Sequence, residues 1–140
     1  MTRILWIVLG AALMTAGCAD PAAPTTPTPA TPTILETFSD TLLVLGANTH
    51  NFSVNAIGGV RVTLNSVTPS AKVGLGIGTP SLGSCSIIQQ VEAVAGSAVV
   101  LSGTATVPGL YCLTIFDIVG SDRVGTLTEP AVYTINVLHS

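Results

Sequence analysis

Two alternating segments flank a double glycine in the stretch His50-Asn-Phe-Ser-Val-Asn-Ala-Ile-Gly-Gly-Val-Arg-Val-Thr-Leu-Asn-Ser66. An alternation of apolar and polar residues places one set of side chains on each face of a β-strand. The apolar set comprises Phe52, Val54 and Ala56 before the glycines and Val60, Val62 and Leu64 after them. The stretch therefore predicts two half-buried strands, and the turn at Ile57-Gly-Gly59 predicts that they pair as a hairpin.

The chain on either side of this stretch is also organised in short β-type segments. Further strands are expected over 36–45, 72–78, 85–91, 98–106, 110–118 and 130–138. The segment 110–118 is apolar at nearly every position, which is typical of a strand in the interior of a sheet. Gly74, Gly76 and Gly78 leave one face of another strand bare, so a backbone or loop should pack closely over it. Seven or eight short strands with no helical period predict a single antiparallel β-sandwich over residues 35–140.

The charge balance argues against two classes of partner. The 140 residues include only four Lys and Arg, with seven Asp and Glu. Arg3 belongs to the leader described below, and Arg61, Lys72 and Arg123 are isolated from one another in the sequence. Nucleic acids and anionic lipid headgroups are bound by clustered basic residues. The sequence therefore predicts no nucleic-acid binding and disfavours electrostatic binding to anionic lipid headgroups.

Residues 1–17 have the organisation of a secretory signal peptide. Arg3 is followed by an apolar run from Ile4 to Leu13 that is too short to span a bilayer. The run ends in Ala16-Gly-Cys18, which resembles the lipobox of bacterial lipoproteins. The resemblance implies that Cys18 is lipidated and becomes the first residue of the mature chain. Several acyl chains on one residue would give stable membrane anchoring.

Two neighbours of Cys18 refine this expectation. Thr15 stands where the lipobox prefers Leu, so an ordinary signal peptide followed by an incidental cysteine is the alternative. Ala19 follows the cysteine, and in a Gram-negative host this residue favours the outer membrane over retention in the inner one. The expected location is the bacterial cell envelope, with the membrane as a partner through lipid on Cys18.

Residues 18–34 predict a disordered linker between the lipid and the domain. The segment Asp20–Thr33 contains five prolines and no large apolar residue. Such a composition cannot form a core and favours polyproline II conformation. At about 3.1 Å per residue, the linker would hold the domain up to roughly 45 Å from the lipid.

The three cysteines divide naturally into a pair and a single residue. Cys85 and Cys112 both lie in the domain, and in an exported chain they most simply form a structural disulfide. Closing a loop of that length would stabilise the domain by roughly 3 to 4 kcal/mol. Cys18 is the residue left over, which agrees with its assignment as the lipid attachment site.

Five short motifs resemble a known family. They are Thr37-Phe-Ser-Asp-Thr-Leu42, His50-Asn-Phe-Ser-Val54, Val60-Arg-Val-Thr-Leu64, Gly109-Leu-Tyr-Cys-Leu-Thr-Ile115 and Tyr133-Thr-Ile-Asn-Val137. Together they look like the bacterial pre-peptidase C-terminal domain and cover most of residues 36–138. The resemblance implies a β-sandwich of the kind found beside secreted peptidases and in other exported proteins. Asp40 stands where that family often has Gly.

No residue pattern predicts catalysis or a cofactor. His50 and His139 are the only histidines, and no Gly-x-Ser-x-Gly segment supplies a nucleophile for them. Four loop acids could gather and bind Ca²⁺ through oxygen ligands, but they lack the Asp-x-Asp-x-Asp spacing of such sites. These acids are Asp40, Asp117, Asp122 and Glu129. The expectation is a protein that is not an enzyme, with no cofactor and no metal.

The sequence thus predicts a non-enzymatic interaction or accessory module at the cell envelope, with an envelope protein as its partner. Its binding sites would be strand edges and loops, notably Thr79–Ser84 and Val119–Glu129. The alternative is a glycan- or cell-wall-binding module. An exposed Tyr111 or Tyr133 would favour that alternative, and full burial of both would count against it.

Overall fold

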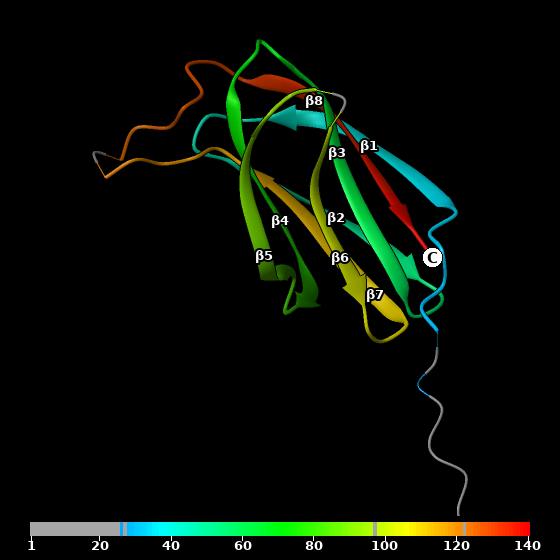
Figure 1. The fold of residues 1–140 in the computed structure, drawn as a ribbon. Helices are drawn as coiled ribbons and strands as arrows, with labels where there is room; N and C mark the ends of the chain where they lie inside the picture. Colours follow the sequence, from blue (N-terminus) through cyan, green and yellow to red (C-terminus); the bar gives the residue numbers. More distant parts are fainter. Residues whose placement is uncertain (1–25, 27, 97, 122) are drawn as a thin grey trace, which may run out of the picture.

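The computed structural model describes residues 26, 28–96, 98–121 and 123–140. Within them the chain forms strands joined by turns and loops (Figure 1). The strands are β1 (Ile34–Leu42), β2 (Ala47–Val54), β3 (Gly58–Thr68), β4 (Lys72–Ser81), β5 (Ser84–Val94), β6 (Val99–Ala105), β7 (Gly109–Phe116) and β8 (Ala131–His139). No helix in this part of the chain is long and apolar enough to cross a membrane.

The strands form two four-stranded antiparallel sheets that pack face to face. The first sheet has the order β1-β8-β3-β6 and the second has the order β2-β7-β4-β5. An eight-stranded double sheet with this crossing order is a jelly roll. The predicted β-sandwich is confirmed, and so is the interior position of the apolar strand, because β7 lies between β2 and β4.

The predicted hairpin at residues 50–66 is wrong. β2 pairs with β7, whereas β3 pairs with β6 and β8, so the chain passes from one sheet to the other between Val54 and Gly58. The side chains nevertheless face as predicted, since Phe52, Val54 and Val62 are all buried. The alternation of apolar and polar residues predicts which side chains face the core, but it does not predict which strand pairs with which.

The core fills the space between the two sheets. Its largest fully buried side chains are Tyr133, Leu42, Leu64, Leu75, Leu113, Ile115, Ile135 and His139. The strand expected over 36–45 would place Val44 inward, but β1 ends at Leu42 and the Val44 side chain is exposed.

The end of the predicted linker is attached to the domain. Ala30 N–H donates to the Ile57 carbonyl (2.6 Å), and Thr33 N–H donates to the His139 carbonyl (2.9 Å). β1 then begins at Ile34, inside the range expected for the linker. The predicted signal peptide and Cys18 lie outside the described residues.

Candidate functional site

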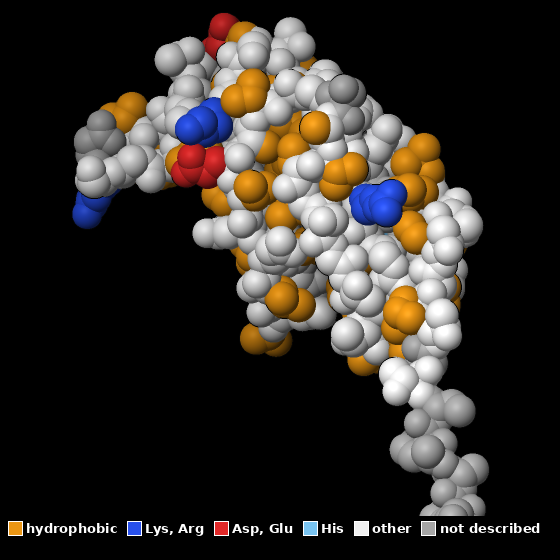
Figure 2. Space-filling model, viewed as in Figure 1, with side chains coloured by type: hydrophobic (Ala, Val, Ile, Leu, Met, Phe, Trp, Pro, Cys, Tyr) orange, Lys and Arg blue, Asp and Glu red, His pale blue; other side chains and the backbone are white. Residues whose placement is uncertain are grey.

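An apolar groove opens along one side of the sandwich, between the edge strands β5 and β6. We call it the edge groove; its volume is about 170 Å³. It is lined by Val60, Val62, Ile77, Gly78, Ile88, Gln89, Leu101, Ser102, Gly103, Thr104, Ala105 and Tyr111. Figure 2 shows hydrophobic side chains along the hollow between the lobe of β4 and β5 and the lobe of β3 and β6. The groove therefore leads from the surface toward the core.

A bulge in β5 shapes one wall of the edge groove. Gln89 pairs with Ile77 and Ile87 pairs with Gly78, which leaves Ile88 as an extra residue. A bulge redirects side chains and increases the local twist of a strand. Here Ile87 lies over the outer face of β4, while Ile88 and Gln89 both line the groove. Ile88 is 72% exposed, so it forms an apolar lip at the groove mouth.

The opposite wall is β6, which has an unprotected backbone edge. Among the described residues β6 pairs only with β3, and β5 pairs only with β4. The sequence of β6, Val99–Ala105, contains no charged residue and no proline. Natural sheet edges are usually blunted by such residues because a bare edge can bind another strand. The edge groove is thus bordered by backbone groups that are available for hydrogen bonds.

Tyr111 lines the inner part of the edge groove. Its ring stacks on Phe52, with the ring centroids 6.0 Å apart, and its hydroxyl donates to the Val107 carbonyl (2.8 Å). The residue is half-buried, whereas Tyr133 is fully buried. Neither tyrosine is exposed, so glycan binding gains no support from an exposed tyrosine, but only Tyr133 is fully buried, so the condition that would count against glycan binding is not met either.

Tyr133 belongs to a polar network between the two sheets. Asn48 Nδ2 donates to the Tyr133 hydroxyl (3.1 Å), which lies 2.7 Å from His50 Nε2. The His50–Tyr133 hydrogen bond can be donated by either partner, depending on the tautomer of the imidazole. Burial lowers the pKa of His50 and outweighs the nearby Asp40 carboxylate, which acts to raise it. Burial likewise raises the pKa of Tyr133.

The second histidine is also held by a specific partner. His139 is buried, and its Nε2 lies 2.8 Å from Glu36 Oε1. Its ring also packs against Phe52, with the centroids 5.3 Å apart. The structure places the two histidines in separate networks, and within the described residues neither ring is hydrogen-bonded to a serine or cysteine side chain.

Asp117 organises the loop that follows β7. Its carboxylate accepts the N–H groups of Leu45 (2.9 Å), Thr126 (2.8 Å) and Leu127 (3.1 Å), and the Thr126 hydroxyl at 2.9 Å. Burial would raise the pKa of this carboxyl, but the four hydrogen bonds favour the anion and together lower the pKa below its ordinary value. Asp117 therefore joins the long loop to the turn after β1.

The acids proposed for Ca²⁺ do not form a cluster in the described part of the chain. Within that part no group of three or more His, Cys, Asp and Glu could hold a metal ion. The oxygens of Asp117 are occupied by the donors described above, and Asp122 lies outside the described residues. Asp40 and Glu129 are exposed, as solvated loop and edge charges would be.

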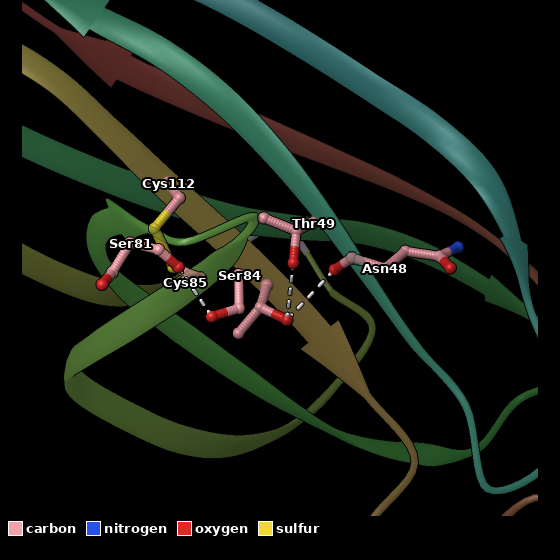
Figure 3. Close-up of a disulfide and its surroundings, with 7 residues drawn as sticks. Asn48, Thr49, Ser81, Ser84, Cys85 and Cys112 are labelled. Carbon is pink, nitrogen blue, oxygen red and sulfur yellow. Dashed lines mark hydrogen bonds between the residues drawn. A yellow bond between two sulfur atoms is a disulfide. The ribbon is translucent and has the colours of Figure 1, made fainter.

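The predicted disulfide forms between Cys85 and Cys112, with their Cα atoms 5.8 Å apart (Figure 3). It connects β5 to β7 across the intervening strand β4. The crossing point is Gly78, which pairs with Cys112 and lies directly beneath the Ser86 backbone. A Cβ atom there would collide with the Ser86 carbonyl. The prediction that a backbone covers the bare face of this strand is confirmed at Gly78.

The loop predicted at Thr79–Ser84 is almost entirely strand. β4 continues to Ser81 and β5 begins at Ser84, so only Leu82 and Gly83 form the turn, both with positive φ. Two-residue turns with positive φ match the twist of a hairpin. The Ser84 hydroxyl donates to the Ser81 carbonyl (2.9 Å) and closes this turn (Figure 3).

A shallow, more polar surface lies on the outer face of the second sheet. Two adjoining hollows share Gln90 and Phe116; we call this surface the outer shelf. The Phe116 ring lies over Gly74 of β4. Thr49 and Thr114 border one hollow and Glu92 borders the other. The shelf combines an aromatic ring with hydroxyl, amide and carboxylate groups.

Sequence reasoning missed the edge groove as a site. One signal was present, because the adjacent Ile87 and Ile88 interrupt the alternation of their strand. The absence of charge and proline from Val99–Ala105 was a second. Neither signal shows that the two segments border one groove, since that depends on strand order.

No protein-family model and no curated protein matches the sequence. Among solved structures, the fold is similar to that of a mitogen derived from Yersinia pseudotuberculosis, with a TM-score of 0.52 and 13% sequence identity. The similarity covers 78% of this chain and 87% of that one. At this identity the likeness shows the fold alone, which agrees with the jelly roll described above.

Proposed function

We propose that this protein is a lipid-anchored, non-enzymatic interaction module of the bacterial cell envelope, which binds an extended segment of a partner protein in the edge groove. The observation that carries the proposal is the combination of an apolar groove with two strand edges that have no neighbour among the described residues. The class of partner is a protein with an exposed apolar segment in strand conformation.

The chemistry of the edge groove suits strand addition. A peptide that adds to a sheet edge gains backbone hydrogen bonds, while pockets for alternate side chains give specificity. The bare edge of β6 supplies the backbone groups, and the groove beside it supplies an apolar pocket. A cavity of about 150 Å³ can hold a benzene ring. The edge groove, at about 170 Å³, is therefore large enough for one large apolar side chain of the partner.

The export and anchoring part of the proposal rests on the lipobox resemblance at Ala16-Gly-Cys18 and on the resemblance to a domain of exported proteins. The disulfide supports it, because such bonds persist in oxidising compartments. Cys18→Ser should move the protein from the detergent-rich phase to the soluble or uncleaved fraction. Unchanged detergent partitioning would refute the anchor.

The groove is tested by crosslinking a tagged full-length protein in cells and identifying what is attached to it. Wild type should capture one envelope protein reproducibly, with the crosslinked peptide mapping to β5 or β6. Ile88→Asp should reduce this capture about tenfold because it places a charge at the apolar lip, a loss of about 1.4 kcal/mol. Val132→Asp is the matched control, since Val132 is exposed on β8 and does not line the groove. Equal capture by both variants would overturn the groove assignment.

A second candidate function, glycan binding, is favoured by the outer shelf. Sugars are bound by an aromatic face together with hydroxyl and amide groups, and Phe116 and Gln90 provide these. Recovery of cell-wall or capsular polymer without a protein partner would support this function. Gln90→Ala should then reduce the recovery, whereas Ile88→Asp should leave it unchanged.

A further inference from the structure

One end of the sandwich combines three turns with the segment through which the chain enters the domain. We call it the tether end. It consists of the β2–β3 connection, the Leu82-Gly83 turn, the β6–β7 turn at 106–108 and the described part of residues 26–33. Figure 1 shows these segments together at the lower end of the molecule. The strand registers agree, since Val54 pairs with Gly109 and Gly58 pairs with Ala105.

The tether end has no acidic or basic side chain among its described residues. No Asp, Glu, Lys or Arg occurs in the described parts of 26–35, 54–60, 79–91 or 102–116. The Lys72–Glu92 ion pair, Asp117 and Glu129 lie toward the opposite end, where β4 begins and β7 ends. On the face that Figure 2 displays, the acidic side chains lie in the upper part of the molecule, and one basic side chain lies about midway along it.

Apolar side chains project from the tips of this end. Leu82 is fully exposed at its turn, and Val107 and Leu110 are more than half exposed at theirs. Scattered exposed apolar residues are normal on a protein surface. The three residues at the tether end are not scattered, because they lie on or beside two turns of one surface that has no charged side chain. Entering a bilayer interface costs such a surface no desolvation of ionised groups, which is the main obstacle for an ordinary protein surface.

The predicted lipid is attached near this same end. The chain joins the domain where Ala30 bonds to Ile57, next to the β2–β3 connection. Eleven residues lie between Cys18 and Ala30, and the fully extended segment would reach at most about 43 Å. A lipid on Cys18 would therefore keep the tether end nearer to the bilayer than the charged end.

From these observations we propose that the tether end docks on the lipid bilayer, with Leu82, Val107 and Leu110 inserted at the level of the headgroups. The proposal rests on the lipid anchor at Cys18 proposed above. The anchor supplies proximity, and the apolar tips fix the orientation of the domain. In this orientation the edge groove, on the side of the sandwich, does not face the bilayer. Its mouth opens sideways, along the membrane plane, and remains accessible to a partner protein.

Tryptophan fluorescence can test this orientation on the full-length protein. The only tryptophan, Trp6, lies in the predicted signal peptide, so Leu82→Trp gives the mature chain a single tryptophan, which can be excited selectively beside the two tyrosines. The lipidated protein is placed in nanodiscs with or without brominated phosphatidylcholine. The Leu82→Trp protein is expected to emit at shorter wavelength and to lose more than half of its emission in brominated lipid. Leu43→Trp is the matched control, because Leu43 is an exposed apolar residue at the opposite end, and its emission should be unchanged.

The mass of the N-terminal peptide from the same samples shows whether Cys18 is acylated. An acylated Leu82→Trp protein whose emission is not quenched overturns the docking proposal and leaves the anchor intact. A shift to shorter wavelength without quenching by brominated lipid means burial against protein, and it overturns docking as well. Equal quenching of the fluorophores at positions 82 and 43 contradicts the end-on orientation. A mature chain without acyl groups overturns both proposals.

Discussion

Gly78 is the residue on which the disulfide and the path of β5 both depend. Its missing side chain lets the Ser86 backbone cross directly over β4. Gly78→Ala should lower the free energy of unfolding by about 2 to 3 kcal/mol, because a Cβ atom would have to displace backbone on that strand. Chemical denaturation of the oxidised protein measures this change.

Gly96→Ala is the matched control for this substitution. A Cβ atom at Gly96 would meet no atom within 4 Å. The control should be neutral or slightly stabilising, because alanine restricts the unfolded chain more than glycine does. Equal free energies of unfolding for the two variants would show that β5 moves easily and that Gly78 has no special role.

His50 should make stability depend on pH near neutrality. Because burial lowers the pKa of His50 from its ordinary value of 6.5, the unfolded chain takes up a proton at higher pH than the folded chain does. The contribution of neutral His50 is thus complete above pH 6.5 and is lost as the pH falls from there through the lowered pKa. His50→Gln lacks this titration, so its unfolding free energy should decline less than that of the wild type over this range. Parallel curves for the two proteins would contradict the assignment of a neutral His50.

At the scale of the elements, the disulfide joins two strands that are not neighbours in their sheet. β5 is an edge strand whose only strand partner among the described residues is β4, so the bond to β7 restrains its first residues. The double variant Cys85→Ala/Cys112→Ala should lose about 3 to 4 kcal/mol of unfolding free energy, as expected for opening a loop with a sequence separation of 27.

Denaturation of the wild type with and without a thiol reductant provides the comparison. The reduced wild type and the double variant should unfold at similar denaturant concentrations, both well below the oxidised protein. The reductant should have no effect on the variant. A variant as stable as the oxidised wild type would show that the strand pairing of β4 and β5 suffices without the bond.

The sequence predicted which segments form strands, and which side chains face the core, more successfully than it predicted which strands pair with each other. In β8 the alternating Tyr133, Ile135 and Val137 all face the core, because the facing of a side chain follows from the local pleat. Pairing depends instead on the path of the whole chain. The double glycine Gly58-Gly59 was therefore interpreted as part of a hairpin turn, whereas it forms the start of β3. The edge groove was missed for the same reason, since β5 and β6 belong to different sheets.

At the scale of the whole molecule, the two proposed surfaces face in different directions. The edge groove lies between β5 and β6, along the side of the sandwich. The turn between β4 and β5, which carries the exposed Leu82, lies at the tether end (Figure 1). A partner strand in the groove and a bilayer at the end could therefore be bound together. Substitutions in the two surfaces should act independently of each other.

Two aspartate variants of the full-length protein separate these surfaces. Ile88→Asp should reduce crosslinking to the partner about tenfold, equivalent to about 1.4 kcal/mol. When it is added to the Leu82→Trp or the Leu43→Trp protein, the quenching of the tryptophan by brominated lipid should not change. Leu82→Asp should keep the partner but loosen the domain from the bilayer, read as faster hydrogen exchange at Val107 and Leu110 in nanodiscs. Both side chains are largely exposed, and aspartate tolerates the positive φ of residue 82, so both variants should fold. If either variant disturbed both readouts to the same extent, the groove and the tether end would belong to one binding surface, and the partner would have to lie against the membrane.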